Sequence, residues 1–77
     1  MNMQPQTMYL GSDGVSNKVE LHYNPQNGGW FAIAGGFQTK YHATQRSAAM
    51  AGNDLARVVC DPKNGPTQFL NVEQYIG

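Results

Sequence analysis

A chain of 77 residues has room for one small domain, and such a domain buries only about 60% of the surface that its unfolded form exposes. Five Lys and Arg residues balance five Asp and Glu residues, so no basic excess is present to attract a polyanion such as nucleic acid. No apolar run approaches the roughly 20 residues of a membrane span. We therefore expect a single soluble α+β domain over residues 1–77.

The N-terminal residues 1–6 lack the positive and apolar regions of a secretory signal peptide, and we interpret them as a flexible lead-in. The single cysteine, Cys60, has no second cysteine with which to form an internal disulfide. A lone thiol is typical of a reducing compartment. Together these features favour a cytoplasmic protein.

Several short segments in the first half of the chain predict strands. Residues 7–10 form the first, which a Gly-Ser-Asp-Gly run closes. Residues 18–24 alternate polar and apolar side chains, with Val19, Leu21 and Tyr23 on one face, and this period of two is typical of a half-buried strand. A turn at residues 25–29 leads to a strand over 30–34, and a Gly-Gly pair leads to another over 37–42.

The hydrophobic period changes at Thr44, which we expect to cap a helix. Small and apolar residues then recur at helical spacing and predict one buried stripe. The stripe comprises Ala48, Gly52, Leu55 and Val59, with Ala51 and Val58 beside it. The opposite side carries Arg46, Met50, Asn53 and Arg57. The helix should end near Cys60, because Pro62 disfavours helical backbone at the residue before it.

Residues 67–72 predict a short final strand, with residues 73–77 as a tail. The order is β-β-β-α-β, which indicates a three- to four-stranded antiparallel sheet with one helix packed on one face. No second helix is present to cover the other face. Either the final strand or the segment around residues 9–10 folds over that face, or it is a binding surface.

The first hairpin has two alternative registers. A four-residue loop over 25–28 pairs Tyr23 with Trp30 and turns Phe31 and Ile33 away from the helix. A five-residue loop reverses every side chain of the strand and turns Trp30 outward. In both registers an aromatic side chain lies on the face away from the helix, where it is a candidate binding anchor.

Catalytic and metal chemistry find little support in the residues. His22, His42 and Cys60 are the ordinary nitrogen and sulfur metal ligands, and none has the paired spacing of a zinc site. The carboxylates are scattered singly, and neither Gly-Gly pair opens a helix as a phosphate loop does. We predict no catalytic residues, no metal, no cofactor and no enzymatic activity.

The chain contains Gly29-Trp30-Phe31-Ala32-Ile33 on a strand, Thr44 before an Ala-rich helix, and a later Phe69-Leu70-Asn71. This pattern, from residue 24 to 71, resembles the plant APETALA-type DNA-binding domain. That family has a three-stranded sheet with one packed helix, and it contacts the DNA major groove through arginines and tryptophans on its strands. The resemblance therefore implies the same fold, with Trp30 as the residue that faces DNA.

This chain departs from that family in its charges. Only Lys18 and Lys40 are basic on the expected strands, and no arginine occurs there, so the resemblance supports the fold more than the activity. The layout is also similar to small bacterial β-β-α proteins and to the compact inhibitors that phages and mobile elements use against host machinery, anti-CRISPR proteins among them. That likeness rests on size, layout and the lack of catalytic residues.

Our main hypothesis is a non-enzymatic protein-binding module, an inhibitor of the phage or mobile-element kind that binds a larger host protein complex in the host cytoplasm. Its expected partner-binding residues are His22, Trp30, Phe31, Ile33, Lys40 and His42. The first alternative is a nucleic-acid-binding module that stacks bases on the exposed aromatic. Its expected residues are Lys18, Lys40, Arg46 and Trp30. The second alternative is a self-associating structural protein, such as a homodimer.

Overall fold

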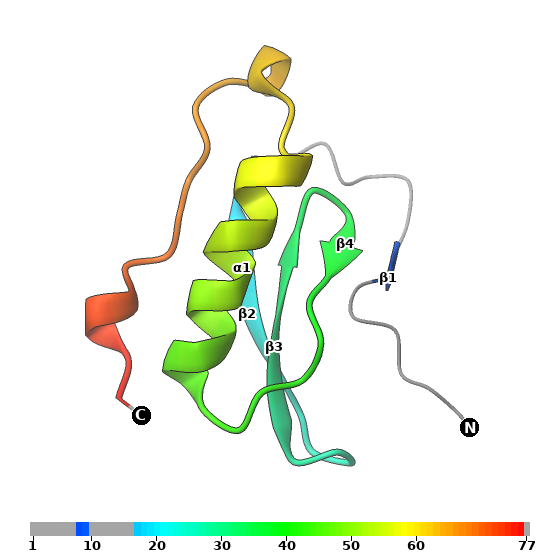
Figure 1. Cartoon of the computed structure of the whole chain (residues 1–77), viewed down its shortest axis with the longest axis vertical. Coiled ribbons are helices and arrows are strands. Elements are labelled where there is room, and N and C mark those ends of the chain that lie inside the picture. The colour runs from blue at the N-terminus through cyan, green and yellow to red at the C-terminus, as the bar shows by residue number, and fades with distance from the viewer. Residues whose placement is uncertain (1–7, 10–16, 77) are drawn as a thin grey trace.

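The computed structural model describes residues 8–9 and 17–76, and it describes side chains from residue 17 onward. The described residues form two layers, a four-stranded antiparallel sheet and the helix α1 (Gln45–Val59), which lies across one face of the sheet (Figure 1). The strands are β1 (Met8–Tyr9), β2 (Val19–Asn24), β3 (Gly29–Ala34) and β4 (Phe37–Gln38), arranged in the order β1-β4-β3-β2. The α+β fold class expected from the sequence is confirmed.

The hairpin between β2 and β3 has the four-residue loop. Tyr23 pairs with Trp30 and Asn24 pairs with Gly29, so residues 25–28 form the turn. Gly28 has a φ of 62°, a backbone conformation that glycine adopts without steric cost. This register places Ala32 and Ala34 beneath α1 and turns Phe31 and Ile33 to the other face of the sheet.

The strand expected over residues 37–42 is interrupted by a β-bulge. The ladder between β3 and β4 runs normally as far as Thr39, whose N–H donates to the Ala32 carbonyl over 2.9 Å. It resumes where Trp30 and His42 exchange two backbone hydrogen bonds of 2.7 Å. Residues 40 and 41 therefore both lie opposite Phe31, and the extra residue is what defines a bulge.

Thr39 holds this bulge in place. Its Oγ1 accepts the Ala32 N–H over 2.9 Å and donates to the Lys40 carbonyl over 2.9 Å. In a regular ladder the Ala32 N–H would donate to a main-chain carbonyl of the neighbouring strand. Here the Thr39 hydroxyl accepts it instead, because the main chain turns away at the bulge. Thr39 is buried, so loss of this acceptor would leave the Ala32 N–H without a partner.

Helix α1 begins and ends as predicted. The Thr44 Oγ1 accepts the Ser47 N–H over 3.1 Å as an N-cap, and Cys60 is the C-cap, just before Pro62 begins the 3-10 turn η1 (Pro62–Asn64). The buried stripe differs from the expected one. It comprises Ala48, Ala49, Gly52 and Ala56, while Leu55 and Val59 are only partly buried. Val58, expected beside the stripe, is 81% exposed.

The helix lies unusually close to the sheet because its contact residues are small. A Cβ atom placed on Gly52 would lie 2.5 Å from the Ala32 Cβ and 2.7 Å from the Val19 Cγ1. Val19 is the largest side chain among the buried apolar residues, and the others are alanines. The core is therefore tight but holds little apolar volume, and the larger apolar side chains of the described residues remain partly exposed.

The expected final strand over residues 67–72 is not formed. Gln68 makes one parallel bridge to Lys18, with backbone hydrogen bonds to Asn17 and Val19, and the chain then leaves the sheet. If the ladder continued, Leu70 would pair with Glu20 and point to the face away from α1. Leu70 instead packs against the core, so burial of its apolar side chain outweighs one further rung of the ladder.

The Asn53 side chain supplies the hydrogen bonds that a strand would otherwise give to the Leu70 backbone. Its side-chain amide donates to the Leu70 carbonyl and accepts the Leu70 N–H, each over 2.9 Å. Asn53 lies away from the buried stripe, as expected, and it holds the C-terminal segment beside α1. The segment continues into the 3-10 turn η2 (Val72–Gln74), so the expected tail begins within an ordered turn. Of the expected N-terminal elements, the lead-in over residues 1–6 and part of the first strand lie outside the described residues.

Candidate functional site

The face of the sheet away from α1, here called the helix-free face, carries a cluster of three rings. His22 stacks on Phe31 with a centroid distance of 5.4 Å and an interplanar angle of 16°. Tyr41 meets Phe31 edge to face, with a centroid distance of 5.4 Å and an angle of 90°. All three side chains are partly exposed. We call His22, Phe31 and Tyr41 the ring cluster.

The bulge brings Tyr41 into this cluster. Because residues 40 and 41 share the position opposite Phe31, Tyr41 faces the same side as Phe31, and the next residue, His42, faces α1. The Tyr41 hydroxyl accepts a hydrogen bond from the Asn24 Nδ2 over 3.1 Å. The ring is therefore fixed at both ends, by Phe31 and by the end of the β2–β3 hairpin.

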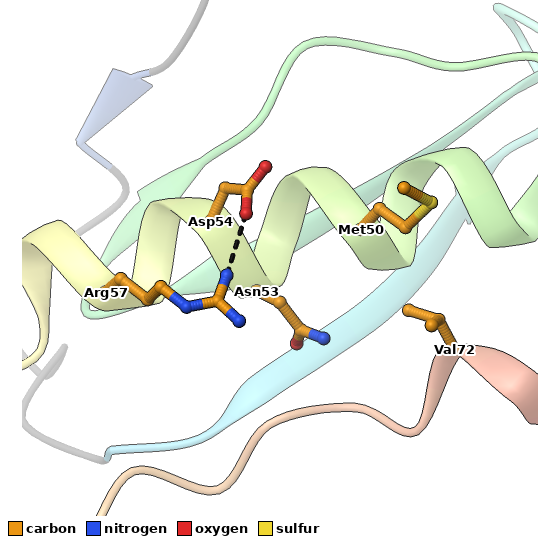
Figure 2. A pocket seen from close by; sticks show the side chains of 5 residues that line it. All are labelled: Met50, Asn53, Asp54, Arg57 and Val72. Atoms are coloured by element: carbon orange, nitrogen blue, oxygen red, sulfur yellow. Dashed lines mark hydrogen bonds and ion pairs between the residues drawn. The ribbon is translucent and has the colours of Figure 1, made fainter.

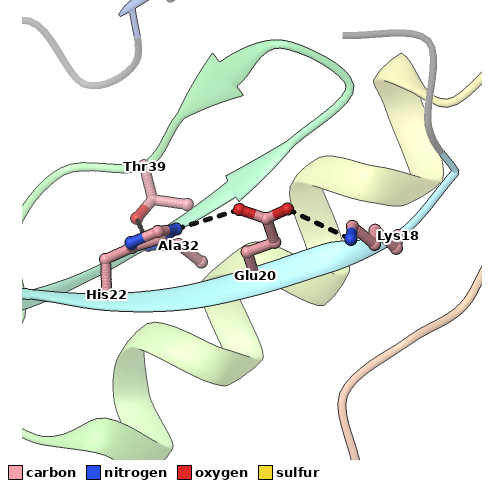
Figure 3. Close-up of polar contacts among 5 residues, drawn as sticks. All are labelled: Lys18, Glu20, His22, Ala32 and Thr39. Atoms are coloured by element: carbon pink, nitrogen blue, oxygen red, sulfur yellow. Dashed lines mark hydrogen bonds and ion pairs between the residues drawn. The ribbon is translucent and has the colours of Figure 1, made fainter.

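Glu20 borders the ring cluster and is electrostatically compensated. Its carboxylate lies 3.0 Å from the His22 Nε2 and 3.5 Å from the Lys18 Nζ (Figure 3). The hydrogen bond from His22, together with that from Lys18, holds the pKa of the Glu20 carboxyl below its usual range despite partial burial. The Lys18 ammonium thus has a carboxylate beside it and stays half exposed, as in other weak surface ion pairs.

The structure brings together half of the expected partner-binding residues. His22, Phe31 and Ile33 lie on the helix-free face, whereas Trp30 and His42 lie on the face that carries α1. Trp30 packs on Tyr23 there, with a centroid distance of 4.8 Å. The register explains the difference, because residues that pair across the hairpin share a face. Lys40 is exposed within the bulge.

The residues of the nucleic-acid alternative do not form one surface. Lys18 lies on the helix-free face and Trp30 on the opposite one. Arg46 belongs to α1, where its guanidinium lies 3.7 Å from the Glu73 carboxylate and 3.5 Å from the Val72 carbonyl. Bases stacked on Trp30 would therefore be remote from the Lys18 charge.

The His42 ring contacts the first turn of α1. Its Nδ1 lies 3.1 Å from the Ser47 Oγ, while its Nε2 is buried and has no hydrogen-bond partner among the described residues. Burial, and to a lesser degree the charge of Lys40, lower the pKa of His42. A serine nucleophile needs a histidine that a third group orients through its other nitrogen. The described residues supply no such group at Nε2.

A small pocket lies on the other side of the molecule, between α1 and the C-terminal segment (Figure 2). Its volume is about 180 Å³, and its lining comprises Met50, Asn53, Asp54, Arg57 and Val72. Arg57 and Asp54 form an ion pair of 2.7 Å, and the Arg57 guanidinium also lies over the Phe69 ring. The charges at this pocket are thus already paired with each other.

The outer edge of β2 adjoins the ring cluster. The backbone N–H and C=O groups of Trp30 and Ala32 point from β3 toward the segment of residues 37–42. Those of Phe31 and Ile33 therefore point toward β2, where they bond to His22 and Glu20. The backbone groups of Leu21 and Tyr23 then point to the outer side of β2. Gln68 occupies this edge at Val19. Among the described residues, Leu21 and Tyr23 have no outward backbone partner, so the edge can accept a further strand.

Three residues of the helix-free face are not among the expected partner-binding residues, namely Glu20, Asn24 and Tyr41. The alternation of residues 18–24 already placed Glu20 and Asn24 on the same face as His22. Tyr41 carried no such signal, because a bulge inserts one residue without a local mark other than Thr39. Of the two expected covers, the C-terminal segment lies beside α1 instead (Figure 1), while Tyr9 pairs with Phe37 in the sheet and residue 10 lies outside the described residues.

Among residues 8–9 and 17–76, no three His, Cys, Asp or Glu side chains lie close enough to hold one metal ion. In the same part of the chain, no helix combines the length and the apolar character that crossing a membrane requires. Comparison with known proteins found no matching family model, no matching curated protein and no matching solved structure. The geometry of the helix-free face is thus the basis for a functional proposal.

Proposed function

We propose that this chain is a non-enzymatic protein-binding module that docks through its helix-free face. The observation that carries the proposal is the ring cluster of His22, Phe31 and Tyr41, which is partly exposed and held in one geometry before any partner arrives. Aromatic side chains that are already ordered lose little conformational entropy on binding, and they are the usual anchors of protein interfaces.

The charges near the cluster favour a protein partner over a nucleic acid. The Glu20 carboxylate lies 3.5 Å from the Lys18 Nζ, and the chain as a whole has no net charge. Binding to a phosphate backbone draws its affinity from free cations, which this face does not concentrate. A partner with an apolar or aromatic surface and a modest polar rim fits better.

The outer edge of β2, which has no backbone partner at Leu21 and Tyr23 among the described residues, adjoins the same surface. A partner that contacts His22 reaches the outward backbone groups of Leu21 and Tyr23 and can pair with them as an added strand. In its most specific form, the proposal is a stoichiometric inhibitor of the phage or mobile-element kind that binds a larger host complex in the cytoplasm. That form rests on the layout that the chain shares with such inhibitors, one helix packed on a small antiparallel sheet.

The chain offers a matched pair of phenylalanines for the test. Phe31 belongs to the ring cluster, and Phe69 is 46% exposed on the side of α1. We expect Phe31→Ala to lower the affinity for a captured partner by about tenfold to a hundredfold, which corresponds to the 1–3 kcal/mol typical of an interface anchor. Phe69→Ala should leave that affinity unchanged.

The measurement is affinity capture from host-cell lysate with and without nuclease, followed by titration of the purified partner with each variant after its folding is checked by circular dichroism. A nuclease-resistant complex that Phe31→Ala weakens selectively supports the proposal. Loss of the complex on nuclease treatment would favour the nucleic-acid alternative. Equal binding by both variants would exclude the ring cluster as the docking site.

A further inference from the structure

Two Asn-Gly pairs occur in the chain, Asn27-Gly28 and Asn64-Gly65, and both asparagines are exposed. Asparagine is a thermolabile residue. When glycine follows, the main-chain nitrogen is unhindered because glycine has no Cβ, and it can attack the side-chain amide carbon. The two pairs have the same chemistry, so any difference between them comes from the fold.

Hydrogen bonds fix the backbone of the second pair, an arrangement called the lock below. The Gly65 N–H donates to the Pro62 carbonyl over 3.2 Å, and the Asn64 N–H donates to the Asp61 carbonyl over 2.9 Å. The buried Asn17 further fixes this loop, since its Nδ2 donates to the Gly65 carbonyl over 2.6 Å and to the Asp61 carbonyl over 2.8 Å. The Gly65 nitrogen would have to give up its hydrogen bond before it could attack.

The first pair has no such lock. The Asn27 N–H is bonded to Asn24, but the Gly28 nitrogen has no hydrogen-bond partner among the described residues. A Cβ placed on Gly28 would meet nothing within 4 Å, so the turn is open on that side. The attacking nitrogen of this pair is therefore both free and uncrowded.

We propose that Asn27 is a site of spontaneous deamidation and that Asn64 is protected from it by the fold. The Gly28 nitrogen loses its proton and bonds to the Asn27 Cγ, and ammonia leaves to give a cyclic imide. Water then opens the imide at either carbonyl, which yields aspartate or isoaspartate. The balance is one water consumed and one ammonia released, with no redox change and no cofactor.

The modified residue lies next to the group that positions the ring cluster. The Asn24 Oδ1 accepts the Gln26 and Asn27 N–H groups, while its Nδ2 donates to the Tyr41 hydroxyl. Isoaspartate lengthens the main chain by one carbon at residue 27 and adds a negative charge. The hydrogen bonds to Asn24 then change, and with them the support of Tyr41. Any effect on partner binding rests on the proposed function, whereas the deamidation does not.

The test is a time course of the purified folded chain at mildly alkaline pH, with peptide mapping by mass spectrometry and enzymatic detection of isoaspartate. We expect residue 27 to convert several-fold faster than residue 64. In urea the two rates should become similar, because unfolding removes the lock on Gly65. Asn27→Gln should abolish the fast conversion, since its longer side chain forms the ring far more slowly.

A second variant tests the lock itself. Asn17→Ala removes both side-chain hydrogen bonds to the loop, so conversion at residue 64 should accelerate while that at residue 27 stays unchanged. Equal rates at the two sites in the folded chain, or a slow rate at residue 27 that rises only in urea, would overturn the proposal. Because the readout is the mass of each peptide, it stands even if no binding partner is found.

Discussion

The two faces of the sheet are built on opposite principles. Beneath α1, the contacts are between small side chains, and Gly52 approaches Ala32 so closely that no further atom fits. On the helix-free face, the rings of His22, Phe31 and Tyr41 contact each other and remain partly exposed. The packed face thus holds the buried core, whereas the helix-free face leaves its rings partly exposed.

The contrast shows that small side chains make the fully buried contacts of this chain. A small domain usually buries its aromatic residues, because they contribute the most apolar area to the core. Here the buried apolar residues are alanines and one valine, and no large side chain among the described residues is fully buried. Large apolar side chains remain partly exposed on both faces, such as Phe31 on the helix-free face and Trp30 on the face that carries α1.

The largest effect is expected on the packed face, from Gly52→Ala. Alanine favours a helix over glycine by about 1 kcal/mol. The added methyl group nevertheless meets Ala32, whose Cβ is fixed to the main chain of β3 and cannot rotate away. Overpacking costs about 1–3 kcal/mol and occasionally more, and here the methyl group meets the Val19 Cγ1 as well as the Ala32 Cβ, so after the helix gain we expect a net loss of about 3 kcal/mol in urea unfolding.

Val58→Ala is the control for this prediction, because Val58 lies on the same helix and is 81% exposed. Its effect should stay within about 0.5 kcal/mol. A Gly52→Ala variant as stable as the parent would mean that α1 can move away from the sheet without loss, and the contrast between the two faces would fail.

The second largest effect on stability is expected from Thr39→Val, at the bulge. Thr39 faces α1, and the bulge that it holds directs Tyr41 to the helix-free face. Valine keeps the shape but removes the acceptor of the buried Ala32 N–H, which costs about 1–3 kcal/mol. Because the bulge sets the direction of Tyr41, the contact between the Phe31 and Tyr41 rings should also change, as nuclear Overhauser effects would detect.

Thr67→Val is the matched control, since Thr67 makes no side-chain hydrogen bond among the described residues. If Thr39→Val destabilises the chain but leaves the two rings in contact, the bulge does not depend on the hydroxyl. Tyr41 would then be placed by the Asn24 hydrogen bond alone.

The smallest effect is expected on the pH dependence of the protein's stability, through His42 on the packed face. Burial lowers the pKa of His42 below its ordinary 6.5, so the unfolded chain binds a proton more readily than the folded chain does. Stability should therefore be highest above pH 6.5 and fall as the pH drops from there toward the lowered pKa of the folded state.

This dependence is measured by thermal unfolding at several pH values, with His42→Gln as the variant that cannot titrate. The variant should lose the change in stability just below pH 6.5. It should keep the change that begins below about pH 4.5, where protonation of Glu20 breaks its contacts with His22 and Lys18. An unchanged profile in His42→Gln would show that His42 is equally solvated in the folded and unfolded chains.

Local patterns in the sequence predicted most of the fold. The alternation over residues 18–24, the turn at Asn27-Gly28, the Thr44 cap and the stop before Pro62 each act within a few residues, and all four are present in the structure. The same alternation placed His22 on the face where it is found. These features can be predicted from the sequence because local hydrogen bonds and backbone sterics determine them.

The remaining features depend on contacts between residues distant in the sequence. Thr39 reaches Ala32 to form the bulge that aims Tyr41, and Asn53 reaches Leu70 to end the expected last strand after one bridge. Neither contact leaves a periodic mark, because each is one side chain that takes the place of a backbone partner. The sequence alone thus determined the β2–β3 hairpin and the ends of α1, whereas contacts in three dimensions determined where the other strands end, which rings face away from α1 and where the C-terminal segment lies.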